Sequence, residues 1–153
     1  MIGLFYSQLP VVASPKYSST SKLLARQYKK PVIGKTNKTR LQIEAAGCYF
    51  YYPRDPNRIV FYESVASDRQ TIINIDGQDI RLKLVKETQG HNKSKRIYRS
   101  GKMTVMMELV EVKEEKDSRT FKEEGGSGPY QAVMTVNRGL SKSVAKLVGT
   151  CGC

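Results

Sequence analysis

Three cysteines, Cys48, Cys151 and Cys153, are the residues whose types and spacing could do chemistry in this 153-residue sequence. A structural zinc site needs four ligands, and three thiols with the single distant His91 do not supply a matching set. A catalytic thiol needs a histidine partner, and His91 lies in a polar stretch. The cysteines therefore predict a disulfide, either between Cys48 and one of the two terminal cysteines or within the Cys-Gly-Cys end itself.

The other polar residues form no recognisable catalytic or cofactor motif. Asp76 and Asp79 flank Gly77, but a calcium ion takes about six or more oxygen ligands, and no loop pattern around them supplies the rest. His91 is expected to be an exposed loop residue. The sequence has no nucleophile elbow, phosphate-binding loop or dinucleotide-binding glycine pattern. We therefore predict no catalysis, no cofactor and no metal site.

A run of aromatic residues from Tyr49 to Tyr52 could stack on nucleic-acid bases, and Arg54 and Arg58 lie beside it. Successive side chains of a strand point to opposite faces, so Tyr49 and Tyr51 would share one side and only half of the run could stack. The simpler interpretation is a core face with a partly covered outer face. Tyr49, Tyr51, Arg54 and Arg58 are the candidate ligand surface.

Two thirds of the net charge of +12 lies in the N-terminal segment. Residues 1–43 hold eight lysine and arginine residues and no acidic residue, whereas the rest of the chain holds 18 basic and 14 acidic residues, a net charge of +4. Such an arm could attract phosphates or anionic lipid headgroups, although like charges also favour a solvated tail. We expect an arm over residues 1–40 and one domain over 41–153. No apolar run reaches the roughly 18 residues that predict a transmembrane helix.

From residue 41 onward, short apolar runs alternate with turn residues, which is typical of an all-β domain. The clearest signal is the hairpin over residues 71–84, in which Asp76-Gly77 suits a type I′ turn and Ile80, Leu82 and Leu84 alternate with charged residues. Further runs bring the count to about eight strands in sequential hairpins: residues 48–52, 59–65, 96–99, 103–112, 130–136 and 140–148. This arrangement favours an antiparallel meander, closed or partly closed as a barrel, or a sandwich.

Two of these strands have irregular patterns. The apolar set Met103, Val105, Met107 and Leu109 changes parity at Val110, which predicts a bulge or bend near Leu109. Residues 140–148 also suit one face of a helix, but they follow a short turn and end on a glycine, so we predict a strand.

A disulfide implies an oxidising compartment, and the first 14 residues agree with export. They form a short apolar stretch followed by small residues, Val11-Val12-Ala13, as in the remnant of a signal peptide. The alternative is an ordinary apolar strand. We therefore expect a periplasmic or secreted protein.

Three segments resemble a family of small exported bacterial proteins of unknown function: Gly47-Cys48-Tyr49-Phe50, residues 74–84, and the final Gly149-Thr150-Cys151-Gly152-Cys153. In that family, a second Cys-Gly-Cys near the start of the domain is the counterpart of the terminal one. Here Ala46 stands at its first position, which leaves an odd thiol. The resemblance covers about a quarter of the chain and implies export and a β domain, but no known activity.

The sequence thus predicts an exported, non-catalytic binding or structural β-barrel-like protein. Its partner would be an acidic protein or another component of the bacterial envelope. The alternative is a nucleic-acid-binding protein that uses the basic arm and the Tyr49–Tyr52 surface.

Overall fold

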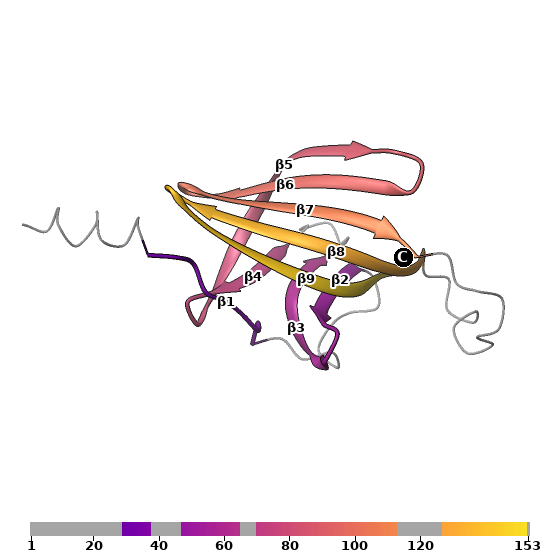
Figure 1. Cartoon of the computed structure of the whole chain (residues 1–153), viewed down its shortest axis with the longest axis horizontal. Helices are drawn as coiled ribbons and strands as arrows, with labels where there is room; N and C mark the ends of the chain where they lie inside the picture. The colour runs from indigo at the N-terminus through magenta and orange to yellow at the C-terminus, as the bar shows by residue number, and fades with distance from the viewer. Residues whose placement is uncertain (1–28, 38–46, 65–69, 113–126, 153) are drawn as a thin grey trace, which may run out of the picture.

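The computed structural model describes residues 29–37, 47–64, 70–112 and 127–152, and every regular element among them is a β-strand (Figure 1). No helix in these ranges is long and apolar enough to cross a membrane. The strands are β1 (Ile33–Gly34), β2 (Gly47–Tyr52), β3 (Asp55–Ser64), β4 (Thr71–Ile75), β5 (Gln78–Gln89), β6 (Lys93–Ser100), β7 (Met103–Glu111), β8 (Ser127–Arg138) and β9 (Ser141–Gly152).

Strands β2 to β9 form a closed, antiparallel up-and-down barrel. Each strand pairs with the next along the chain, and β9 returns to pair with β2, from Gly47 opposite Gly152 to Tyr51 opposite Val148. The short β1 is an extra strand that pairs with β4. The prediction of about eight strands in a meander is confirmed, and the architecture is a barrel because no edge of the eight-stranded ring stays open.

Tight turns join most neighbouring strands of the meander. Asp76 and Gly77 connect β4 to β5 with φ angles of 54° and 81°, which confirms the predicted type I′ turn. Gly101 and Gly139 also have positive φ, in the β6–β7 and β8–β9 turns. Residues 140–148 fall mainly in β9, so the prediction of a strand there is confirmed.

The barrel interior is filled by side chains from alternate positions of every strand. The predicted inward set of β7, Met103, Val105, Met107 and Leu109, is buried. The largest fully buried side chains are Tyr98, Phe50, Phe61, Ile59, Ile73, Ile75, Met107, Met134 and Leu147. Phe61 packs edge-on against both Phe50 and Tyr98, with ring centroids 5.9 and 5.4 Å apart.

The bulge predicted near Leu109 is wrong. β7 keeps an unbroken register with both β6 and β8, so Leu109 continues the inward set and Val110 points outward, 38% exposed. Register shifts lie elsewhere, in the β2–β3 pair, between Leu84 and Lys86, and between Ser127 and Tyr130. The change of parity in the sequence therefore arises from an apolar side chain on the outer surface, and not from the extra residue of a bulge.

Residues 29–37, which belong to the expected arm, lie against the barrel end that carries the β4–β5 turn. The Asp76 carboxylate accepts hydrogen bonds from the Val32 amide and from Arg138, while Arg138 also donates to the Lys29 carbonyl. Farther along, the Thr36 amide and hydroxyl both donate to the Ile59 carbonyl, at 2.7 and 3.1 Å. Residues 1–28 and 38–46 lie outside the described residues.

Candidate functional site

A polar cluster lies inside the barrel, toward the end where β2 begins and β9 ends. Arg96 of β6 donates from Nη1 to Glu63 Oε2 and from Nε to Glu87 Oε1, both at 2.8 Å. The Tyr98 hydroxyl donates to the same Glu63 oxygen at 2.9 Å. These groups lie mostly out of solvent, since the side chains of Arg96 and Glu63 are only 20% and 13% exposed.

Burial and neighbouring charges favour the protonated forms of Tyr98 and Arg96 in this cluster. Burial and the Glu63 carboxylate raise the pKa of Tyr98, so its phenol stays protonated and donates. Burial alone would lower the pKa of Arg96, but Glu63, Tyr98 and Glu87 together outweigh it and raise this pKa. One guanidinium thus bridges two carboxylates and links β3, β5 and β6, and the filled core continues beyond it.

The Cys48–Cys151 disulfide lies beside this cluster, and it joins residues that face each other across β2 and β9. Cys48 is 4% exposed, and its sulfur lies 3.9 Å from Arg96 Nη1. The structure thus selects one of the pairings that the sequence left open. Cys153 lies outside the described residues.

A hollow of about 360 Å3 lies at this end of the barrel, with the disulfide and Arg96 in its wall. Two described cations line this hollow, the exposed Lys93 and the partly buried Arg96, and Arg96 is already engaged by Glu63 and Glu87. Since the core below is filled, this hollow is a shallow mouth and not the entrance to an internal cavity.

The larger hollow lies on the outside of the barrel, over β5 to β9. Strand register sets two rows of outward side chains there, because directly paired residues face the same side. The first row runs across five strands: Thr88, Lys95, Glu108, Val133 and Lys146. The second row runs across β6 to β9: Lys93, Val110, Gln131 and Val148.

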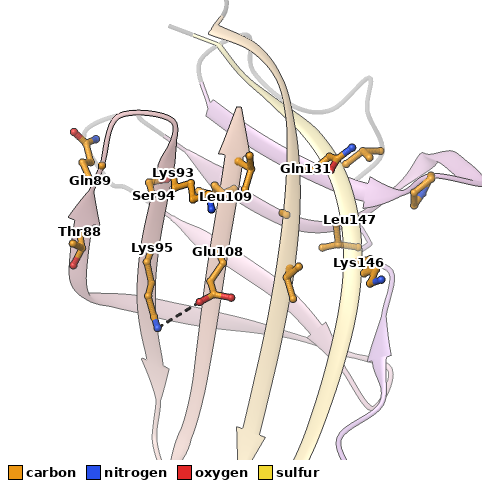
Figure 2. A pocket seen from close by; sticks show the side chains of 16 residues that line it. Thr88, Gln89, Lys93, Ser94, Lys95, Glu108, Leu109, Gln131, Lys146 and Leu147 are labelled. Atoms are coloured by element: carbon orange, nitrogen blue, oxygen red, sulfur yellow. Dashed lines mark ion pairs between the residues drawn. The ribbon is translucent and has the colours of Figure 1, made fainter. Parts of the chain in front are cut away.

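These two rows line a depression of about 810 Å3, here called the outer depression (Figure 2). Pro53 extends it at the side of the β2–β3 turn. The buried, inward-facing positions between the two rows, Leu109 of β7, Ala132 of β8 and Leu147 of β9, also line it. Lys95 and Glu108 pair across it at 3.5 Å, both about half exposed. Three lysines and one glutamate among its described lining residues give it a positive charge.

The cations continue on the outer face beyond the depression. Lys83 of β5 lies directly opposite Arg99 of β6, and both side chains are exposed. Like charges in directly opposite positions destabilise a sheet, so this pairing does not contribute to folding.

Two of the four residues of the predicted ligand surface, Tyr51 and Arg54, lie next to residues that line the outer depression. Tyr49 and Tyr51 project outward from β2 and stack on each other, with ring centroids 6.3 Å apart and planes 27° apart. Arg54 is exposed in the β2–β3 turn, whereas Arg58 forms an ion pair with Asp55 at 3.1 Å. Tyr51 pairs with Val148 and so adjoins the depression.

Sequence reasoning missed the outer depression because its residues come from five strands. The alternation of charged and apolar residues in β5 was the available signal, but the register of β6 to β9 was needed to bring Lys93, Lys95 and Lys146 around one hollow. His91 is exposed in the β5–β6 turn, as expected. Within the described ranges, no group of three or more potential metal ligands occurs.

No protein-family model, no curated protein and no solved structure matches this chain.

Proposed function

We propose that this chain is an exported, non-catalytic binding protein of an oxidising compartment, in which the barrel is a rigid scaffold for a binding surface on its outside. The observation that carries the proposal is the Cys48–Cys151 disulfide, which closes the barrel between its first and last strands. Disulfides persist mainly in oxidising compartments. The resemblance to exported bacterial proteins and the apolar start of the sequence support the same compartment.

The filled interior favours the outer surface as the place of binding. Barrels that hold a small ligand keep an internal cavity, but here Tyr98, Met107 and Met134 occupy the centre and are fully buried. The polar cluster around Arg96 closes the region between this core and the mouth. The outer depression, with its positive charge, is then the larger surface on which a partner could bind.

Export and oxidation are tested together in the native host. The full chain should be recovered from the periplasm or medium, and intact-mass measurement after alkylation without reduction should show two cysteines protected. Three alkylated cysteines in the recovered protein would contradict the proposal. A C153A variant is the control, because it should leave no cysteine open to alkylation while keeping the Cys48–Cys151 bond.

Nucleic-acid binding is the second candidate, and the stacked, outward pair Tyr49 and Tyr51 favours it. It predicts oligonucleotide binding that weakens steeply with salt and falls about tenfold in a Y49A/Y51A variant. Arg54 is the better phosphate contact, since Arg58 is engaged by Asp55. Deletion of residues 1–43, which hold all eight cations of the basic arm, without any loss of binding would exclude the arm as a contributor.

A further inference from the structure

We propose that the outer depression binds an extended, acidic polypeptide segment that carries apolar residues in its middle. This inference rests on the proposed binding function and names the chemistry of the partner. It depends on how charge and apolar surface are distributed over the two rows that line the depression (Figure 2).

The lysines stand at the two margins of the depression. Lys93 and Lys95 project from β6, and Lys146 projects from β9, three strands away. Neighbouring strands lie about 4.8 Å apart, so the margins are separated by about 14 Å. An extended chain covers this width with about four to five residues. Carboxylates on either side of a short apolar stretch would therefore reach both margins at once.

The middle of the depression carries one charge, the Glu108 carboxylate, and is otherwise neutral. Val110 of β7 and Val133 of β8 face outward there, and Val148 follows on β9. Val110 is 38% exposed, so a partner that covers it removes apolar surface from water. A bare polyanion would leave this strip uncovered, whereas apolar side chains between two acidic ends would cover it.

The same lining argues against nucleic acid as the occupant. The described residues around the depression include no aromatic side chain on which a base could stack, and their cations are all lysines. Arginine is the residue that recognises phosphate with a planar fork, and none lines the depression. Point charges from lysine suit carboxylates spaced along a flexible chain.

Glu108 provides a direct test of an acidic partner, because it is the residue with a carboxylate among the described residues of the two rows. It lies at the centre of the first row and engages Lys95 at 3.5 Å. An acidic partner must compete with Glu108 for Lys95. Removing this charge should therefore strengthen binding, which a purely structural role of the residue would not do.

The experiment uses the full oxidised protein and a synthetic peptide of about ten residues, with three glutamates at each end and four valine or leucine residues between them. Affinity is measured by calorimetry at low and physiological salt. We expect K93E/K146E to weaken binding at least about tenfold, E108Q to strengthen it about threefold, and V133T to weaken it about threefold. The matched control K83E/K102E changes the net charge equally at exposed positions outside the depression and should stay within about twofold of wild type.

Three results would overturn the proposal. The first is equal loss in K93E/K146E and K83E/K102E, which would mean that net charge alone governs binding. The second is unchanged affinity for a peptide with serine in place of the apolar residues. The third is tighter binding to a ten-nucleotide oligothymidylate, or to vesicles with anionic headgroups, than to the peptide, provided that the K93E/K146E change abolishes this tighter binding. Each result is independent of the cysteine state in the host, so failure here is distinguishable from failure of the proposed export.

Discussion

Loss of the Cys48–Cys151 disulfide should lower the stability of the barrel more than any single contact on its surface. The bond closes a loop with a sequence separation of 103 residues. In the chain-entropy description, a loop of this length restricts the unfolded chain enough to stabilise the folded state by about 4.7 kcal/mol. Single domains are stable by only about 5–15 kcal/mol in total, so this is a large fraction.

The assay is urea unfolding of oxidised wild type, reduced wild type and a C48A/C151A variant. Circular dichroism is the suitable probe, because the chain has no tryptophan. With a slope near 2 kcal/mol per molar urea, the expected drop in the midpoint is about 2–3 M for both altered forms. Alanine avoids a buried polar group at Cys48, which is 4% exposed.

The pairing of β2 with β9 would survive in the variant, since its backbone hydrogen bonds do not involve sulfur. C153A should keep the wild-type midpoint, as Cys153 takes no part in the bond. If C48A/C151A and reduced protein unfold at the wild-type midpoint, the disulfide does not close the barrel in solution and the reasoning fails.

Three further predictions concern the interior, the β4–β5 turn and barrel closure. Y98F removes a hydrogen bond to the Glu63 carboxylate and should cost about 1.5–3 kcal/mol by urea unfolding at pH 7. Because the pKa of Tyr98 is raised, the folded state keeps a proton that the unfolded chain loses near pH 10, so wild-type stability should fall above about pH 10. The stability of Y98F should lack this fall above about pH 10. If the stability of both proteins falls equally with pH in this range, the prediction is contradicted. The hydrogen bond from Arg138 lowers the pKa of Asp76, so the stability that this pair contributes is present at neutral pH and is lost as the pH falls below about 4. D76N should cost about 1 kcal/mol at pH 7 and show a flatter acid dependence in thermal melts; an unchanged acid limb would refute this. A Cβ at Gly149 would collide with the Tyr49 carbonyl and the Phe50 ring, so G149A should destabilise by about 1–3 kcal/mol, and a neutral result would show that β2 and β9 can move apart.

The hairpins could be predicted from the sequence because their signals are local. Asp76-Gly77 specifies its own turn, and the alternation of Ile80, Leu82 and Leu84 needs no information from distant residues. The count of about eight sequential strands then leaves few ways to remove exposed edges, and closure as a barrel is one of them.

The pattern of apolar residues at Leu109 led to the wrong prediction of a bulge for a physical reason. An apolar residue out of phase usually marks a bulge, because the outer face of a soluble strand is normally polar. Here Val110 lies outside in an unbroken register and forms part of the outer depression. An apolar side chain on the outer face thus resembles a structural irregularity when only one strand is considered.

The sequence by itself determined the strands, the turns and the expectation that Cys48 or its terminal partners form a disulfide, because each depends on residue type and short-range spacing. Only the tertiary structure decided that Cys48 pairs with Cys151, since that depends on the register of strands at opposite ends of the chain. The same holds for the outer depression. Lys93, Lys95 and Lys146 meet around one hollow because the pleat sends them outward and the register aligns their strands, and neither relation is local in sequence.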